Sequence, residues 1–132
     1  MSHHRELVNP AELHPAPGFS HVAVAEGRRL VFLAGQVALD RDFALIGSDD
    51  LLEQTKAAMR NLKTAMDTVG VAWDDIVRRT IYTTEPTRYE TITAGIDAVT
   101  GGAPHPPQTI LGVTGLALPE LLVEIECTAV VA

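Results

Sequence analysis

The sequence has few cysteines and aromatic residues and no long apolar run. Its single cysteine, Cys127, excludes an internal disulfide and any zinc site built from several cysteines. The apolar runs are short, such as 30–34 and 130–132, whereas a membrane-spanning helix needs about 20 apolar residues. The segment 1–6 is polar and no apolar stretch follows it, so we expect no export signal. These features predict a soluble intracellular protein. Cys127 lies in the apolar run 121–131, which favours a small buried core residue over a reactive thiol.

Positive charge is also scarce, because 17 acidic residues outnumber 10 basic ones and give a net charge of −7. The clearest basic doublets, Arg28-Arg29 and Arg78-Arg79, lie in strand-like segments, where neighbouring side chains point to opposite faces. Such doublets do not form the basic patch that phosphate binding requires. Nucleic acid is therefore not an expected partner. No phosphate-binding glycine loop or Gly-x-Ser-x-Gly motif occurs either.

The length of 132 residues, with 46% hydrophobic and 20% charged residues, predicts one domain over residues 1–132. Prolines at positions 10, 15 and 17 predict that residues 1–16 form an irregular arm, with at best a short strand around Glu6–Val8. No internal repeat or low-complexity segment is apparent. We expect the arm to lead into a folded core that needs no disulfide or metal.

Two helices are predicted from apolar residues at three- and four-residue spacing. The first covers 50–69, with Asp50 in a capping box and Gly70 as a left-handed stop. The second opens at a Thr-x-x-Glu capping box that starts at Thr87, and it ends at the glycine pair 101–102.

Strands are predicted from β-branched, alternating segments around these helices. Two runs, 22–24 and 30–33, flank a Gly-containing turn and predict a hairpin. Further strands are expected over 76–84, 109–113 and 121–131. The order ββαβαββ predicts an α+β fold, with two helices on one face of a mixed sheet.

The last strand predicts which face of the sheet meets the helices. Its alternation directs one apolar set to the helices, namely Leu121, Val123, Ile125, Cys127 and Ala129. The opposite set mixes apolar and acidic residues, namely Leu122, Glu124, Glu126, Thr128 and Val130. Self-association would cover this mixed face.

Candidate chemistry is limited to a few side chains. Glu124 and Glu126 project from the same face of a strand, and an apolar environment would raise the pKa of one of them, as suits a general acid or base. A pair of solvated surface glutamates fits the same spacing. His105, between two prolines, fits either a cleft residue or an exposed loop residue, and the histidines lack zinc-like spacing.

Five segments, taken together and in order, resemble the RidA/YjgF family of reactive enamine/imine deaminases. They are PGFSHVAV at 17–24, LAGQVALD at 33–40, the helical Gln-Thr…Asn-Leu at 54–62, DDIVRRTIY at 74–82, and Pro-Pro-Gln-Thr…Val-Glu-Ile-Glu at 106–126. The resemblance covers about residues 17–132.

The resemblance implies a chorismate-mutase-like fold and a cytoplasmic homotrimer with three clefts between neighbouring subunits. It also implies an enzyme without cofactor or metal, which hydrolyses imines of the 2-aminoacrylate type to 2-keto acids and ammonia. In the family an Arg grips the substrate carboxylate, a Tyr near the N-terminus closes the site, and a Glu that corresponds to Glu124 positions or activates water.

The sequence departs from the family at several of these positions. Gln108 replaces the Arg, Phe19 the Tyr, Ala34 a Ser and Thr93 an Asn, whereas Gly35 and Glu124 are retained. A neutral amide does not form the two-pronged, charge-assisted pair that Arg makes with a carboxylate. We therefore expect Glu124 as the catalytic residue, no metal, and a more apolar ligand cleft, formed by Phe19, Ala34, Gly35, Thr93, Gln108 and Ile110.

Two classes of function follow from these departures. The chain is either a divergent Rid enzyme, acting on an imine, enamine or related metabolite without an Arg-gripped carboxylate, or a catalytically lapsed trimer that binds a small ligand. Retention of Glu124 favours the enzyme, and loss of the polar site groups favours the binder. A ribonuclease role is disfavoured by the acidic charge.

Overall fold

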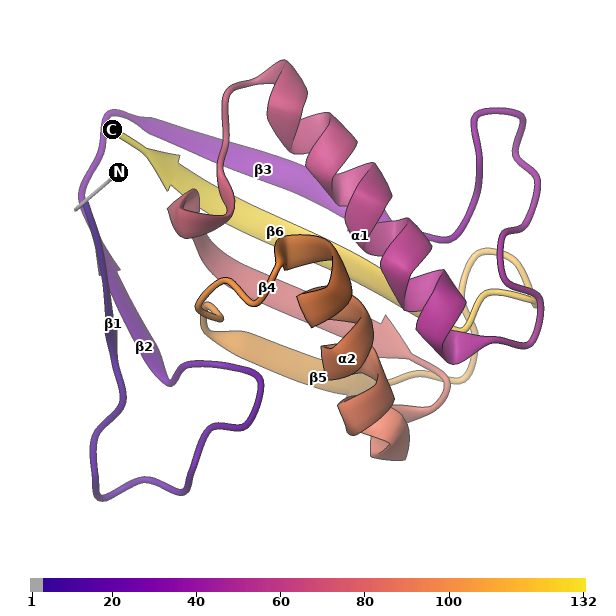
Figure 1. The fold of residues 1–132 in the computed structure, drawn as a ribbon, viewed down its shortest axis with the longest axis horizontal. Helices are drawn as coiled ribbons and strands as arrows, with labels where there is room; N and C mark the ends of the chain where they lie inside the picture. Colours follow the sequence, from indigo (N-terminus) through magenta and orange to yellow (C-terminus); the bar gives the residue numbers. More distant parts are fainter. Residues whose placement is uncertain (1–3) are drawn as a thin grey trace.

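Four strands form the main sheet of this computed structural model, which describes residues 4–132. Their spatial order is β3 (Arg29–Gln36), β6 (Val123–Val131), β4 (Ile76–Thr83) and β5 (Gln108–Gly112). Strand β6 runs antiparallel to both of its neighbours, and β5 runs parallel to β4 (Figure 1). The predicted mixed sheet is confirmed.

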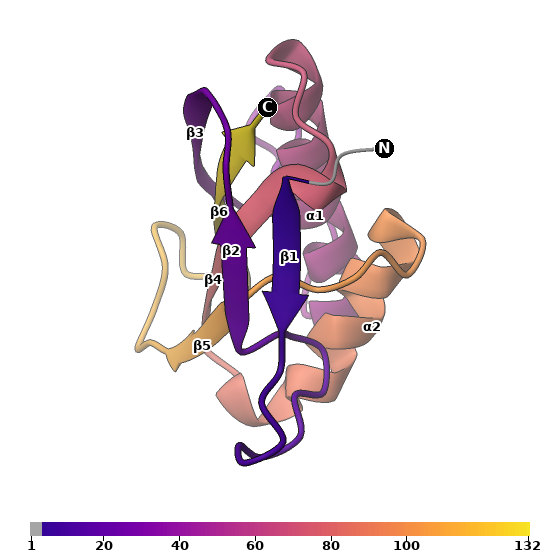
Figure 2. The ribbon, with the colours of Figure 1, turned by 90° about the vertical axis from the view of Figure 1, so that its left-hand side faces the viewer.

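Two helices, α1 (Leu51–Thr68) and α2 (Tyr89–Thr100), pack side by side on one face of this sheet, as Figures 1 and 2 show. The Asp50 side chain caps α1 by accepting from the Glu53 N–H at 3.0 Å. The return bond of the predicted capping box does not form, because the Asp50 N–H donates to the Gly47 carbonyl at 3.0 Å. Gly70, at φ +72°, follows the helix end as predicted.

The start predicted for the second helix is wrong. A 3-10 turn, η2 (Pro86–Arg88), precedes α2 and includes Thr87. The cap position falls on Arg88, whose side chain makes no capping bond. Because Pro86 favours the first position of a helical turn, Thr87 lies inside that turn and does not adopt the extended conformation of an N-cap. Gly101 ends α2 at φ +73°, as predicted. A second 3-10 turn, η1 (Trp73–Asp75), precedes β4.

The predicted hairpin of the two early strands is also wrong. Strand β2 (Val22–Ala25) pairs with β1 (Arg5–Val8) in a separate two-stranded sheet, at the left of Figure 1. Strand β3 pairs with β6 instead. Gly27 permits this route, because a Cβ there would lie 2.6 Å from the Val131 carbonyl oxygen of β6. The element order is therefore ββ-βαβαββ, and the arm contains a regular strand.

The core lies between the main sheet and the helices. All five residues of 121–131 predicted to face the helices are buried. Four of them, Val123, Ile125, Cys127 and Ala129, join one core with apolar side chains of both helices and β4, among them Met59, Leu62, Met66, Ile81, Ile92 and Ile96. Leu121 packs in a smaller cluster with Ala38 and Ala57. Full burial of such a side chain contributes roughly 1.5–3 kcal/mol. Cys127 is among the buried residues, which confirms it as a core residue, and burial raises the pKa of its thiol to about 12.

No helix of residues 4–132 lies on the opposite face of the sheet (Figure 2). Phe32 and Leu30 of β3 are 74% and 65% exposed there, and Leu111 of β5 is also exposed. The mixed apolar and acidic face is therefore as the sequence predicted, and its self-association stays a prediction.

Within residues 4–132, no helix is long and apolar enough to cross a membrane.

Candidate functional site

A cleft with a volume of about 420 Å³ lies between the N-terminal arm, the start of α2 and strand β5. Four of the predicted ligand residues, Phe19, Thr93, Gln108 and Ile110, line it together. The rest of the lining is mostly proline and aromatic side chains, namely His14, Pro15, Pro17, Pro86 and Tyr89. This volume matches that of a small-molecule site.

The arm is held against the body of the protein next to this cleft. Ser20 donates its N–H to the Pro106 carbonyl at 3.1 Å and its hydroxyl to the His105 carbonyl at 2.6 Å. The ring of Phe19 packs edge-on to that of His21, with centroids 5.2 Å apart. Gly18 adopts φ +75°, and a Cβ there would lie 2.7 Å from Thr93 Oγ1. The glycine therefore permits both the turn and the close approach that place Phe19 in the cleft.

Gln108 and Ile110 occupy alternate positions on β5, so both side chains point to the helix-bearing side of the sheet. Arg79, next to Gln108 in the register of β4 and β5, shares that side with the buried Cys127 of β6. The Arg79 Nε donates to Gln108 Oε1 at 2.5 Å. Gln108, which forms the β5 end of the cleft, is therefore hydrogen-bonded to a buried arginine.

Arg79 is a residue next to the cleft that the sequence did not identify. It is only 4% exposed, and burial lowers its pKa to about 10, so that the guanidinium stays protonated at neutral pH. Its Nη2 donates to the Gly18 carbonyl at 3.2 Å and to His105 Nδ1 at 2.9 Å. The sequence contained one signal for it. Arg79 and Ile81 are two residues apart on a strand, so both side chains point to the same, apolar face of the sheet.

His105 fits neither of its two predicted roles. Its ring lies between Arg79 and Asp97, with Nε2 3.0 Å from the Asp97 Oδ1. Burial, followed by the nearby Arg79 charge, lowers the pKa of His105, and Asp97 opposes the shift. The imidazole is therefore a support for Arg79 and not one of the cleft-lining residues.

The remaining predicted residues, Ala34, Gly35 and Glu124, do not line this cleft. Gly35 and Glu124 lie together, because a Cβ on Gly35 would overlap the Glu124 Oε2. Ala34 is exposed beside them, where the pairing of β3 with β6 shifts register. These three residues form a second group on the strands β3 and β6.

The two candidate glutamates differ in their surroundings. Glu126 accepts a short hydrogen bond from the Tyr82 hydroxyl, and this bond is the largest cause of a raised Tyr82 pKa. Glu124 is half-buried and makes no hydrogen bond or ion pair with any residue of the described range 4–132. Of the pair, Glu124 is therefore the carboxylate that remains available.

The two groups lie on opposite faces of the main sheet. Glu124 is in register with Tyr82, and Tyr82 with Leu111, whereas Gln108 is in register with the buried Arg79. Because side chains alternate along a strand, Gln108 points to the helices and Glu124 points away from them. One chain therefore does not bring the predicted catalytic residue and the predicted ligand residues around a single ligand.

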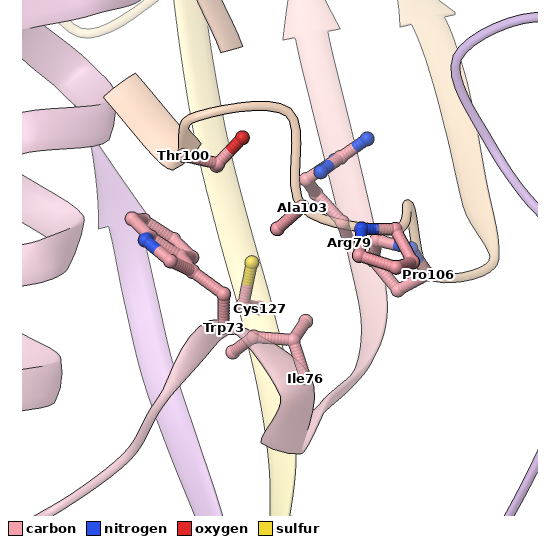
Figure 3. Close-up of a pocket in the computed structure, with 8 residues that line it drawn as sticks. Trp73, Ile76, Arg79, Thr100, Ala103, Pro106 and Cys127 are labelled. Atoms are coloured by element: carbon pink, nitrogen blue, oxygen red, sulfur yellow. The ribbon is translucent and has the colours of Figure 1, made fainter. Parts of the chain in front are cut away.

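A second, much smaller cavity of about 10 Å³ lies behind Arg79. Figure 3 shows Arg79, Ile76 and Cys127 on the strands, with Pro106 and Ala103 on the loop beyond. Thr100, also at its wall, has a buried Oγ1 without a hydrogen-bond partner among residues 4–132. This volume suits about one water molecule and no metabolite. No cluster of three or more His, Cys, Asp or Glu suited to a metal occurs in that same range.

Comparison with known proteins gives consistent matches over nearly the whole chain. Residues 10–131 match the family described as Endoribonuclease L-PSP. The RutC family protein slr0709 of Synechocystis is 26% identical over 117 residues, which are 88% of this chain and 89% of that protein.

Two solved structures are similar in fold and in sequence. YyfB of Yersinia pestis, described as a protein of unknown function of the conserved Rid family, has a TM-score of 0.90 and 38% identity, covering 97% of this chain and 99% of its own. Rv2704 of Mycobacterium tuberculosis, described as a member of the YjgF family, has a TM-score of 0.66 and 31% identity, covering 96% and 99%.

Proposed function

The chain belongs to the RidA/YjgF family, also described as Endoribonuclease L-PSP, and we propose that it is a divergent member with small-molecule clefts between the subunits of a homotrimer. Support for a shared cleft comes from the opposite orientations of Gln108 and Glu124 on one sheet. A second copy is needed to bring a Glu124 carboxylate to the cleft of the first. The exposed Phe32 and Leu30 on the Glu124 face supply apolar surface for that contact.

The reaction proposed is hydrolysis of a C=N bond in an imine or enamine-derived metabolite. Glu124 accepts a proton from water while the water oxygen bonds to the imine carbon, and the nitrogen takes up a proton from solvent. Glu124 then returns its proton to the nitrogen, the C–N bond breaks to release ammonia, and the hydroxyl loses its proton to solvent as the carbonyl forms. Imine and water thus give a carbonyl compound and ammonia. Gln108 hydrogen-bonds the substrate at the β5 end of the cleft.

The single observation that carries this proposal is the state of Glu124. It is half-buried against Gly35 and lacks a hydrogen-bond or ion-pair partner among residues 4–132, whereas Glu126 is held by Tyr82. A carboxylate without a structural partner is free to accept a proton from a bound water. A carboxylate with a solely structural role would be hydrogen-bonded in the way that Glu126 is.

Gln108 determines which imines are suitable. Each hydrogen bond to a charged group contributes about 1.5–3 kcal/mol, and a neutral amide loses the paired bonds of an arginine to a carboxylate. We therefore expect poor turnover of imines derived from amino acids and better turnover of neutral imines.

The test measures ammonia release from a panel of neutral imines by the wild type, Glu124→Gln and Glu126→Gln. We expect Glu124→Gln to lower turnover by about 100-fold or more, within the range of a lost general base. Glu126→Gln is the matched control, and we expect it to retain most of the turnover. Equal losses in the two variants would overturn the role of Glu124.

A binding protein without turnover is the alternative, favoured by one specific observation. Among the described residues of one chain, no Asp, Glu, Lys or Arg lines the cleft. A thermal-shift screen of neutral imines and small carboxylates distinguishes the two functions. A higher melting temperature with no turnover, unchanged in Glu124→Gln, identifies the binder.

A further inference from the structure

The guanidinium of Arg79 is a buried charge that no carboxylate of the described residues contacts directly. Among residues 4–132 it forms no salt bridge, and its hydrogen bonds go to Gln108, the Gly18 carbonyl and His105. Asp97 is separated from it by the ring of His105. The positive charge therefore stays uncompensated at short range, immediately behind the side chain that lines the cleft.

Arg79 decides which end of the Gln108 amide faces the ligand. A guanidinium only donates hydrogen bonds, so the atom of Gln108 that it contacts at 2.5 Å must be the oxygen. The Nε2 of Gln108 has no hydrogen-bond partner among residues 4–132, and the residue lines the cleft. The N–H₂ group of Gln108 is therefore an unused hydrogen-bond donor in the cleft, and the Arg79 guanidinium behind it sets its orientation.

The hydrogen bond from Arg79 also fixes which ring nitrogen of His105 carries the proton. His105 must accept from Arg79 through Nδ1, and its Nε2–H therefore donates to Asp97 at 3.0 Å. Hydrogen bonds in such a chain polarise one another in a region of low dielectric. With its oxygen bound to a cation, the Gln108 amide is a stronger donor at Nε2 than a free amide would be.

We propose that Arg79 is a positioning residue that makes the cleft selective for ligands with a hydrogen-bond acceptor, such as a carbonyl or carboxamide oxygen, at the β5 end. A cationic or donor-only group at that end would meet the Gln108 N–H₂ and the Arg79 charge. This inference rests on the proposed function only in using the same cleft, because it specifies which ligand chemistry Gln108 accepts.

The test uses benzamide and benzamidine, which have the same shape but present an oxygen acceptor and a cationic donor respectively. Titrations followed by ¹H–¹⁵N NMR measure both dissociation constants. We expect the wild type to bind benzamide at least about tenfold more tightly, which corresponds to about 1.4 kcal/mol. Equal affinities, or no binding of either compound, would overturn the proposal.

Gln108→Glu is the decisive variant. One carboxylate oxygen still accepts from Arg79, so the fold and the side-chain position are kept, whereas the atom facing the cleft changes from donor to acceptor. We expect the preference to reverse in favour of benzamidine. A preference for benzamide that survives this substitution would contradict a role for the Gln108 amide.

Arg79→Met and Arg79→Lys separate positioning from a merely structural role. Without the guanidinium the amide can rotate, so we expect Arg79→Met to reduce the preference for benzamide to less than about threefold, and Arg79→Lys to retain part of it. If Arg79→Met does not fold, Gln108→Glu decides alone. Glu124→Gln should keep the benzamide preference, so that failure of hydrolysis and failure of this inference remain distinguishable.

Discussion

The Nε of Arg79 lies 2.5 Å from Oε1 of Gln108, so an arginine is buried directly behind the residue that, by the resemblance to the family, takes the place of an arginine. The substitution at 108 is therefore linked to the residue beneath it. Two arginines at these positions would place like charges in contact, whereas Arg and Gln form a hydrogen bond. This relationship determines how the missing arginine can be restored.

Restoring it should require an exchange of both residues. We expect Gln108→Arg alone to lower the free energy of unfolding by roughly 1–3 kcal/mol, because Arg79 loses its acceptor and gains a like charge. The double variant Arg79→Gln with Gln108→Arg keeps one amide and one guanidinium, and we expect it to regain most of that stability. Urea unfolding of the wild type, both single variants and the double variant gives the coupling energy. Additive effects would contradict the link.

The double variant also tests how Gln108 limits the substrate. Combined with Phe19→Tyr, it returns a guanidinium and a phenol to the cleft, and we expect increased ammonia release from amino-acid-derived imines. The matched control is Phe19→Tyr alone, which lacks the carboxylate-binding group. No gain over this control, in a variant with wild-type stability, would count against the assignment of Gln108 to the ligand site.

Gly35 should be required for the position of Glu124 more than for folding. A Cβ at Gly35 would overlap the Glu124 carboxylate, which sits at the end of a flexible side chain and can move. We therefore expect Gly35→Ala to abolish turnover, while the melting temperature changes by no more than about 4 °C, as for about 1 kcal/mol. Gly115→Ala is the control, because no atom lies within 4 Å of its Cβ position. Unchanged turnover in Gly35→Ala would contradict the role of Glu124.

The sequence predicted the elements of the fold better than their pairing. Periodicity located α1 and the buried face of β6, because burial of apolar side chains imposes 3.6- and 2-residue repeats on the chain. The hairpin of β2 with β3 failed, because β-forming residues do not specify a partner strand. The long-range pairs β1–β2 and β3–β6 depend on the whole chain.

The site was predicted as a set of residues but not as an arrangement. The resemblance supplied Gln108, Thr93 and Glu124, and four of the expected ligand residues do share one cleft. Arg79 was missed because, although it lies within the family-like segment 74–82, it was interpreted only as half of a basic doublet. The Arg79–Gln108 hydrogen bond joins two strands at residues 29 apart in the sequence, so no local sequence pattern predicts it.

Stability should depend on His105 at mildly acidic pH. Burial and the charge of Arg79 lower the folded-state pKa of His105 below its ordinary 6.5, so the unfolded chain binds this proton more readily. The contribution is thus complete above about pH 6.5 and is lost as the pH falls below it. Urea midpoints between about pH 8 and about pH 5 measure the loss, with His105→Asn as the control. Equal pH dependence in both proteins would contradict it.

Assembly should depend on the helix-free face of the sheet. Phe32 is 74% exposed in the single chain, on the face that also carries Glu124, and we expect light scattering to report a trimer for the wild type. Phe32→Asp places a charge in the proposed contact and should give a monomer, since an unpaired charge is costly to bury. Phe43→Asp is the matched control, because Phe43 is 69% exposed outside the main sheet, at φ +67°, which Asp tolerates.

Because the proposed cleft needs Glu124 from a second copy, the Phe32→Asp monomer should also lack turnover while it still binds benzamide. A wild-type monomer with full turnover would show that one chain suffices and would exclude the shared cleft.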